Sequence, residues 1–397
     1  MTRALWVTAE PPDRNLTGGS IREAYLLEAL GREVETHLLL AGTLQDPATR
    51  AALAGITEVD VVGHPPPTQR TRRRVDDLRR VFLEREPADV IECRNQVQEL
   101  GRRMTALGPF DIVCVEHDRL APLIGVRQPG AGRWALTLHN LPSERKRHEM
   151  ALARTRRQRW LYRREHEDAR RFQAAMAEAF DVVFVTSDAD AAALDRAAVV
   201  IPNGVDTARF RPTPVPAAPV LVFTGMLRWG PNVEGVTWFC RDVLPVVRAA
   251  VPDVRFDIVG SEPVPEVRAL AALPGVAVHA DVPSVVPWLE QARVAVVPLR
   301  IGSGTRLKAL EAMSAGRPVA GTTIGLEGLG IEPGVHAVVG DAPDQLAAAV
   351  IGLLTDVDLA ARVAAAGADH ARGQFGWDAI GRRFVDALLA LGQRQAR

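Results

Sequence analysis

Short apolar runs alternate with longer amphipathic segments along nearly the whole chain, and this alternation restricts the fold more than any other feature of the sequence. Helical patterns, such as those at residues 20–30 and 154–176, separate the apolar runs. Strands that alternate with helices predict an α/β protein with doubly wound parallel sheets. The runs that we predict to be strands lie at residues 4–7, 36–40, 59–62, 112–115, 134–138, 182–185, 220–223, 256–259, 276–279, 294–297, 318–320 and 337–339.

A proline-rich stretch interrupts this alternation once, at residues 211–219, which read Arg-Pro-Thr-Pro-Val-Pro-Ala-Ala-Pro. Proline fixes its own φ and lacks a backbone N–H, so the stretch is typical of a semi-rigid linker. The chain has 397 residues, whereas single hydrophobic cores stop growing at about 250–300 residues. We therefore predict one α/β domain over residues 1–205, a linker over 206–219, a second α/β domain over 220–374 and a terminal helix over 375–397.

Composition narrows the classes of function. The 48 Lys and Arg residues balance 48 Asp and Glu residues, so the net charge gives no indication of a nucleic-acid partner. The three cysteines, Cys93, Cys114 and Cys240, are odd in number and far apart, which predicts neither a disulfide framework nor a zinc site. No apolar run approaches the roughly 20 residues of a membrane span, and the first apolar run is too short for a signal peptide. We therefore expect a cytoplasmic protein.

One stretch, residues 141–171, is strongly basic, with eleven Lys or Arg against five Asp or Glu. Two interpretations are open. The charges form a solvated helix face, which we favour, or they form a surface that docks on anionic lipid at the inner face of a membrane.

The strongest motif lies at residues 298–320. A strand ends at Pro298, a glycine loop follows, and we predict a helix that begins near Gly304 and ends at Gly316, where glycine suits a left-handed C-terminal cap. Backbone N–H groups at a helix N-terminus bind phosphate. Arg306 and Lys308 add positive charge at the end where the helix dipole disfavours cations, unless an anion is bound. The alternative is a surface ion pair between Lys308 and Glu311, three residues apart.

This motif, Gly302-Ser303-Gly304-Thr305-Arg306-Leu307-Lys308 followed by Leu310-Glu311-Ala312-Met313, resembles the donor-site motif of the retaining glycosyltransferases of family 4. The resemblance is greatest to a bacterial subgroup active in polysaccharide assembly. It covers nearly all of residues 199–330, including Ile201-Pro202-Asn203-Gly204-Val205-Asp206 and Phe256-Asp257-Ile258-Val259-Gly260-Ser261, and is thinner over 1–198. It implies the GT-B fold, in which two Rossmann-like domains face a central cleft and a final helix crosses back to the N-terminal domain. It also implies a nucleotide-diphosphate sugar as co-substrate, with no metal or other cofactor.

The resemblance assigns roles in the predicted donor domain. The glutamate at Glu311 hydrogen-bonds the ribose hydroxyls, and the helix N-terminus at Ser303, Gly304 and Thr305 faces the diphosphate. The family has an earlier glutamate where this chain has Ser303, so the transferred sugar stays open. This chain also departs from the family at two positions near the diphosphate. Met226 and Asn232 lie near the positions where the family has an Arg and a Lys that hold it. Arg228 is then the nearby cation, and we infer that Arg306 and Lys308 take over part of the charge neutralisation.

In the predicted acceptor domain, Gly18 and Gly19 match the paired-glycine loop that approaches the donor phosphate and the acceptor. The alternative is a simple turn. His139 follows a buried strand and resembles the family histidine that contacts the transferred sugar near the reacting carbon, so we predict it to be catalytic. The alternative is a capping or exposed histidine at a strand end.

Two other motifs are rejected. Asp188-Ala189-Asp190 has the form of a metal-binding Asp-x-Asp, but we interpret Asp188 as the N-cap of a helix over 190–196. No Gly-x-Gly-x-x-Gly follows the first strand, which argues against a dehydrogenase. The predicted function is a retaining glycosyltransferase of polysaccharide, glycolipid or natural-product assembly. The alternatives are a sugar-nucleotide epimerase or phosphorylase on the same fold, and a non-catalytic paralogue that binds a nucleotide sugar.

Overall fold

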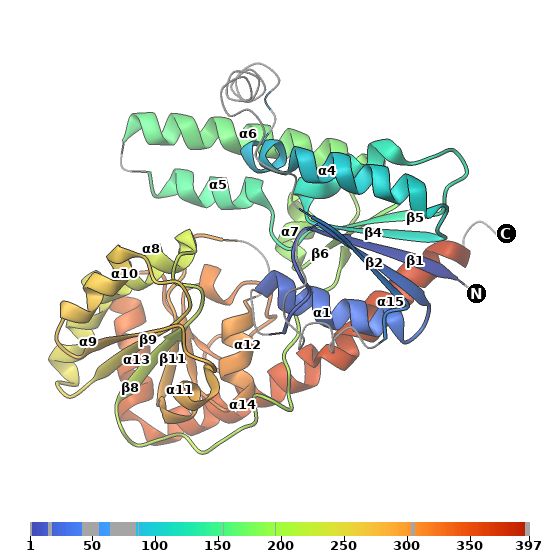
Figure 1. The fold of residues 1–397 in the computed structure, drawn as a ribbon. Coiled ribbons are helices and arrows are strands. Elements are labelled where there is room, and N and C mark those ends of the chain that lie inside the picture. Colours follow the sequence, from blue (N-terminus) through green and yellow to red (C-terminus); the bar gives the residue numbers. More distant parts are fainter. Residues whose placement is uncertain are drawn as a thin grey trace. The chain divides into compact units, whose positions relative to one another are not determined.

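The computed structural model describes residues 2–14, 18–41, 55–63, 85, 87–153, 155–194, 196–302 and 306–393 (Figure 1). The chain divides into two compact units. The first comprises Met1–Ile201 and Ile380–Arg397, and the second comprises Pro202–Ala379. Each unit is a parallel sheet covered by helices, as the alternating sequence pattern predicts.

The sheet of the first unit has seven described strands in the order β3-β2-β1-β4-β5-β6-β7. All neighbours pair in parallel. Every apolar run predicted in this part of the chain forms a strand, with ends that differ from the prediction by at most one residue. β7 was not predicted, because two residues give no periodicity. The strands are β1 (Arg3–Thr8), β2 (Glu35–Ala41), β3 (Glu58–Val62), β4 (Ile112–Glu116), β5 (Arg133–Thr137), β6 (Val182–Val185) and β7 (Val199–Val200).

Helices cover both faces of this sheet, because successive side chains of a strand point to opposite faces. Leu5 of β1 lies in one cluster with Leu100, whereas the ring of Trp6 contacts the ring of Phe384 on the other face, 5.8 Å away. Figure 1 shows α4 and α6 over the first face and α1 and α15 over the second. The helices are α1 (Gly18–Gly31), α4 (Ala88–Leu107), α5 (Pro142–Ala151), α6 (Arg156–Ala179), α7 (Asp188–Ala193) and α15 (Trp377–Gln393).

The cap of α7 differs from the sequence prediction. The helix begins at Asp188, and Ser187 is its N-cap, with Ser187 Oγ accepting a hydrogen bond from the Asp190 N–H at 3.1 Å. The prediction of Asp188 as the cap of a helix over 190–196 is therefore wrong. Asp190 is buried and accepts a 2.7 Å hydrogen bond from the Ser187 hydroxyl, which is the geometry of a helix start.

The sheet of the second unit has six described strands in the order β10-β9-β8-β11-β12-β13, again parallel throughout. The chain runs outward from β8 to one side and returns to continue from β11 on the other. In such sheets ligands bind at the carboxyl ends of the two strands where this reversal occurs. The strands are β8 (Val220–Thr224), β9 (Arg255–Gly260), β10 (Val276–Ala280), β11 (Val294–Val297), β12 (Val319–Gly321) and β13 (Val338–Val339).

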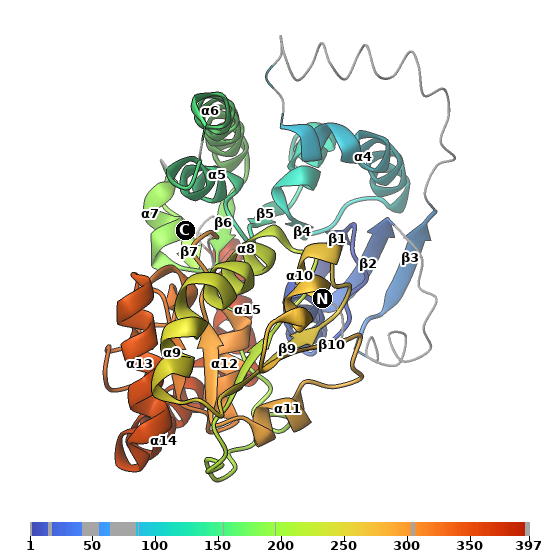
Figure 2. The same cartoon turned by 90° about the vertical axis from the view of Figure 1, so that its left-hand side faces the viewer.

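The helices of this unit pack around one apolar core, and α13 and α14 lie side by side (Figure 2). None of the described helices of the chain contains an apolar stretch long enough to cross a bilayer. The α-helices of the unit are α8 (Gly230–Trp238), α9 (Leu244–Ala250), α10 (Pro265–Ala269), α11 (Val286–Gln291), α12 (Leu307–Ser314), α13 (Pro343–Thr355) and α14 (Val357–Phe375).

The proline-rich stretch is packed on the second unit rather than free. Residues 206–219 contain neither helix nor strand, and Phe210 within them is buried in the core. Arg317, itself buried, donates hydrogen bonds to the Thr213 hydroxyl at 2.8 Å and to the Pro214 carbonyl at 3.0 Å. A buried guanidinium supplies the donors that proline lacks, so the stretch is anchored without regular structure.

Candidate functional site

The helix of the strongest motif starts later than predicted. α12 begins at Leu307, and Arg306 precedes it in an extended conformation with φ −89° and ψ 91°. The prediction of a start near Gly304 is therefore wrong, and Ser303, Gly304 and Thr305 lie outside the described residues. The end of the helix is as predicted, with Gly316 at φ +74°.

This helix end is a Schellman motif. The N–H groups of Gly316 and Arg317 donate to the carbonyls of Met313 and Ala312, both at 2.9 Å. The motif ends α12 and leads the chain into β12.

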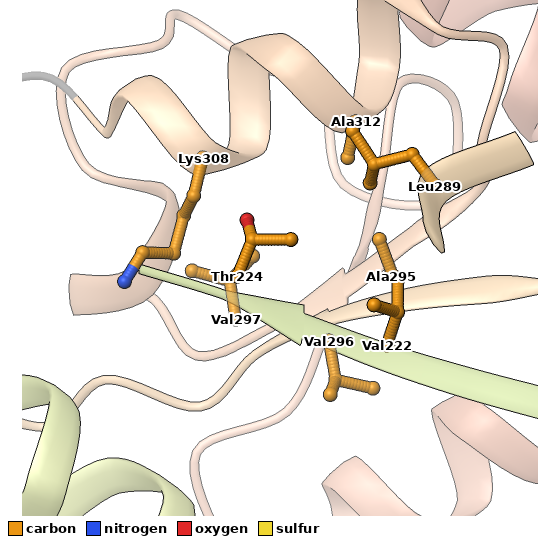
Figure 3. Close-up of a pocket in the computed structure, with 8 residues that line it drawn as sticks. All are labelled: Val222, Thr224, Leu289, Ala295, Val296, Val297, Lys308 and Ala312. Carbon is orange, nitrogen blue, oxygen red and sulfur yellow. The ribbon is translucent and has the colours of Figure 1, made fainter. Parts of the chain in front are cut away.

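Lys308 lies on α12 and reaches across to the end of β8. Its Nζ donates to Asn232 Oδ1 at 2.6 Å and lies 4.2 Å from the centre of the Phe223 ring. Asn232 is itself fixed, because its Nδ2 donates to the Met226 carbonyl at 2.7 Å. Figure 3 shows the side chain of Lys308 among those that line a small gap, with its nitrogen at the end of the β8 arrow. Lys308 therefore contacts Asn232 rather than forming the alternative ion pair with Glu311.

A glycine makes room for this ammonium group. Gly225, the residue after β8, has φ +152°, and a Cβ built there would lie 2.9 Å from Lys308 Nζ and 2.9 Å from Asn232 Nδ2. No carboxylate among the described residues lies within ion-pair distance of Lys308 Nζ. The end of β8 thus holds an ammonium group that forms no ion pair with a described acid.

The two titratable groups of α12 have strongly shifted pKa values. Burial, reinforced by the positive charge of Arg306, lowers the pKa of Lys308 from 10.5 to about 7. Burial raises the pKa of Glu311 from 4.5 to about 7, against the attraction of Arg209 and Lys308. An anion bound beside Lys308 would restore its charge, and donors bound to Glu311 would favour its ionised form.

The other predicted cations have partners. Arg306 is buried; its Nε donates to the Ile324 carbonyl at 2.9 Å, and its guanidinium lies 3.3 Å from Glu327. Arg228 forms an exposed ion pair with Glu262 at 2.6 Å, and such surface pairs contribute little to stability. Lys308 therefore fits the neutralising role better than Arg306 or Arg228 does.

In the first unit, the structure brings Gly19 and His139 together. His139 follows β5 and is buried, and its Nε2 lies 2.7 Å from Glu116 Oε2. Gly19, near the start of α1, lies so close that a Cβ there would be 3.2 Å from His139 Nδ1. Gly18 begins the same helix and is exposed. The carboxyl end of this sheet thus presents the histidine and the glycine that the resemblance singles out.

Several charged residues at this end of the sheet were missed from sequence. His117 follows β4, and its ring lies 4.0 Å from that of His139, centre to centre. Its Nε2 lies 3.2 Å from Oε1 of Glu23, a fully buried residue of α1. One signal was available, because Glu116 and His117 directly follow an apolar run, as His139 does. The complete set of missed residues is Glu10, Arg22, Glu23, Glu116, His117 and Arg119.

Burial dominates the electrostatics of this cluster. It raises the pKa of Glu116 to about 7 and lowers the pKa of Arg22 to about 10. Burial, together with the charge of His117, holds the pKa of His139 well below its usual value. Burial is the largest single influence on His117 and lowers its pKa, but the hydrogen bond to Glu23 and the negative charges of Glu23 and Glu10 together outweigh it, so the net shift is upward.

One trio in this cluster offers metal-ligand atoms. The nearest ligand atoms of Glu23, His117 and His139 lie within 4.8 Å of one another. Buried Arg22 interacts with Glu23 of this trio and with Glu116, and its positive charge opposes a divalent cation there. The expectation that no metal takes part stays a prediction.

Comparison with known proteins identifies the second unit. Residues 218–356 match the sequence profile of the family described as glycosyl transferases group 1. They belong to that family. A D-inositol 3-phosphate glycosyltransferase of Thermobispora bispora is 32% identical over 117 residues, which are 29% of this chain and 27% of that protein. The chain therefore matches about a quarter of the length of this curated relative.

Solved structures extend the comparison to the whole chain. Sucrose-phosphate synthase from Thermosynechococcus elongatus is 18% identical with a TM-score of 0.69, over 98% of this chain and 99% of that one. Anabaena HepE in complex with UDP and glucose is 15% identical with a TM-score of 0.64, over 98% and 100%. Trehalose 6-phosphate synthase from Burkholderia multivorans is 14% identical with a TM-score of 0.65, over 99% of both. At these identities the likeness concerns the fold, which is GT-B.

Proposed function

We propose that this protein is a retaining glycosyltransferase that moves a sugar from a nucleotide-diphosphate sugar to an acceptor hydroxyl. The observation that carries the proposal is the ammonium of Lys308 at the end of β8, 2.6 Å from Asn232 and without a described carboxylate partner. Glu311 lies three residues further along α12, where a carboxylate can accept hydrogen bonds from a ribose diol. Anabaena HepE, which has a similar fold, is described in complex with UDP-glucose.

Each residue then has a role in the reaction. The bond between the anomeric carbon and the diphosphate breaks, and Lys308 stabilises the charge that develops on the leaving diphosphate. The acceptor oxygen forms the new bond on the face that the diphosphate leaves, and its proton passes to the diphosphate. His139 contacts the transferred sugar, and Gly19 leaves room for ligand beside it. No protein nucleophile is required.

Nucleotide affinity should have an optimum near pH 7. Lys308 must be protonated to bind the diphosphate, so affinity falls as pH rises above its pKa of about 7. Glu311 must be ionised to accept from the ribose, so affinity falls as pH drops below its pKa of about 7. Calorimetric titration with UDP from pH 5.5 to 9 measures both the fall in affinity at low pH (the acidic limb) and the fall at high pH (the alkaline limb).

Two matched variants assign the limbs. Lys308→Met should remove the alkaline limb, and Glu311→Gln should remove the acidic limb except for the part that comes from the phosphate itself, whose second pKa is about 6. Affinity that is independent of pH between 6 and 9 would exclude both assignments.

Turnover separates the proposal from its alternatives. A transferase releases nucleoside diphosphate in proportion to a suitable acceptor hydroxyl, whereas an epimerase releases none when it returns the epimeric nucleotide sugar. A non-catalytic paralogue binds the nucleotide sugar and leaves it unchanged. A panel of nucleotide sugars tested with and without acceptors therefore distinguishes the three.

We also propose that a membrane contacts the beginning of α6 rather than the whole of residues 141–171. Helices α5 and α6 lie side by side (Figures 1 and 2), and acids between them engage the cations of α5. Lys146 Nζ lies 2.9 Å from Glu149 and 2.7 Å from Glu165. For α5 the solvated-face interpretation is the better one.

The first turns of α6 differ from α5. The first turn of α6 contains no acidic residue. Trp160 and Leu161, which follow it, are 61% and 43% exposed. Arginines beside exposed aromatic and aliphatic side chains are typical of surfaces that dock on anionic lipid. The arginines of this segment without a described carboxylate partner are Arg156, Arg157, Arg159 and Arg163.

Vesicles that contain anionic lipid should therefore bind the protein at 0.01 M salt and release it steeply by 0.1 M. The Debye length falls from about 30 Å to about 10 Å over this range. Charge reversal at Arg156, Arg157 and Arg159 should weaken co-sedimentation by roughly 100-fold or more, because the loss of three cations alone costs about 1 kcal/mol each. The same reversal at Lys146 on α5 is the matched control. Equal binding to neutral and anionic vesicles would contradict the proposal.

A further inference from the structure

His117 occupies a backbone conformation that suits glycine. Its φ is +66° and its ψ is 145°, a region that other residues enter at a cost of about 1–3 kcal/mol. Its backbone is held on both sides: its N–H donates to the Thr137 carbonyl at 2.9 Å, and its carbonyl accepts from the Leu120 N–H at 3.2 Å. A side chain in such a place indicates that the imidazole is needed there.

This imidazole joins two elements of the first unit. Its Nε2 lies 3.2 Å from Glu23 Oε1 on α1, and its ring stacks on that of His139 with a tilt of 37°. His139 in turn lies 2.7 Å from Glu116 Oε2 at the end of β4. Each imidazole thus has its own carboxylate, and the centres of the two tilted rings lie 4.0 Å apart.

Two imidazole rings this close do not both carry a positive charge readily. Unit charges about 4 Å apart repel by about 4 kcal/mol at the dielectric typical of protein sites. The contact with Glu23 favours the charge on His117, and the burial of His139 disfavours a second one. The pKa shifts agree, because that of His117 is upward and that of His139 strongly downward. The titratable and charged groups that surround the pair are Glu10, Arg22, Glu23, Cys114, Glu116 and Arg119.

We propose that His117 is a positioning residue that carries the positive charge of the pair and so holds the stacked His139 ring neutral. The catalytic consequence rests on the proposed function. The anomeric carbon gains positive charge as the diphosphate leaves, as in other glycosyl transfers. A neutral His139 can contact the sugar without repelling that charge, whereas an imidazolium would oppose it.

Imidazole NMR of the whole protein tests the proposal without any substrate. His139 should stay neutral from pH 5.5 to 8 in the wild type, with its signals assigned by their loss in His139→Asn. In His117→Gln, which keeps a polar group near Glu23 but no charge, the pKa of His139 should rise by about one unit or more. Glu116→Gln is the matched control, because removing the acid on the other side should not raise it. An unchanged His139 titration in His117→Gln would overturn the proposal.

A second pair of measurements keeps the test decisive. If His117→Gln fails to fold, His117→Gly relieves the backbone strain and removes the same charge, so it should fold and show the same rise. In turnover assays His117→Gln should lose activity on the acidic side and retain it above pH 8, whereas loss of a merely structural residue lowers activity equally at every pH. An NMR shift without any transferase turnover would refute the proposed function alone. Turnover without the shift would refute the role of His117 alone.

Discussion

Replacing Lys308 by methionine should lower turnover by about 100-fold or more while making the empty protein more stable. The loss of turnover follows from the missing charge at the leaving diphosphate, which is worth several kcal/mol in a site shielded from water. The gain in stability has a different cause. The pKa of Lys308 is depressed from 10.5 to about 7 in the folded protein, so below pH 7 folding must hold a partly buried ammonium that the unfolded chain solvates freely.

The sign of the pH dependence follows from linkage. Because the folded pKa lies below the unfolded one, the penalty is fully present below pH 7 and disappears as pH rises toward 10.5. Lys308→Met should therefore stabilise by about 1–3 kcal/mol at pH 7 and by little at pH 10. Thermal melts at both pH values measure this difference, and melts with UDP should show a smaller gain from ligand in the variant than in the wild type.

Two other cations of the second unit serve as controls. Arg306→Met should lose stability in the empty protein, because Arg306 donates to Ile324 at 2.9 Å and pairs with Glu327. Arg228→Ala should change little, since its pair with Glu262 is exposed. If Lys308→Met instead loses stability and keeps full activity, Lys308 is a structural residue, and the diphosphate site has to be sought near Arg228.

Glu311→Ala should weaken the binding of a nucleoside diphosphate by roughly 10- to 100-fold. A carboxylate that accepts hydrogen bonds from two ribose hydroxyls contributes about 1.5–3 kcal/mol, the range for hydrogen bonds to a charged group. Calorimetry at pH 8 is the appropriate measurement, because the pKa of Glu311 is about 7 and the group is then mostly ionised.

Glu311→Gln separates charge from shape in that experiment. The amide still accepts one set of hydrogen bonds, so its affinity should lie between those of the wild type and Glu311→Ala. The same measurement with a 2′-deoxyribose diphosphate should show a smaller effect of either variant, because one of the two donors is gone. Unchanged affinity in a folded Glu311→Ala protein would remove this residue from the site.

Local patterns predicted most of the fold, because parallel strands buried on both faces are apolar along their whole length. Every predicted apolar run became a strand, and Gly316 ends α12 in the left-handed conformation. The start of α12 was wrong for a reason that lies outside the local sequence. Arg306 looks like a residue of the first turn, but its guanidinium reaches Ile324, 18 residues away. A local pattern contains no information about that contact.

The site of the first unit was harder to predict for the same reason. Glu23 and Arg22 lie on a helix, where charged residues are usually exposed, yet both are fully buried. Their partners are distant in the sequence: Glu23 contacts His117, 94 residues away, and Arg22 interacts with Glu116. The sequence does mark His139 through its position after a strand. It does not mark the acids that set its protonation, because they come from separate elements.

Asn232 and Lys308 have a consequence for the way sequences of such transferases are compared. In an alignment, the asparagine at position 232 counts as the loss of a lysine that the resembled family uses. In space, Lys308 Nζ lies 2.6 Å from Asn232 Oδ1, so an ammonium group stands beside the asparagine although another helix supplies it. A column-by-column comparison treats position 232 as the loss of a lysine and treats position 308 as unrelated to it. Under the proposed function the two positions act as a single exchange, in which the ammonium group beside the diphosphate is supplied from a position 76 residues further along the sequence.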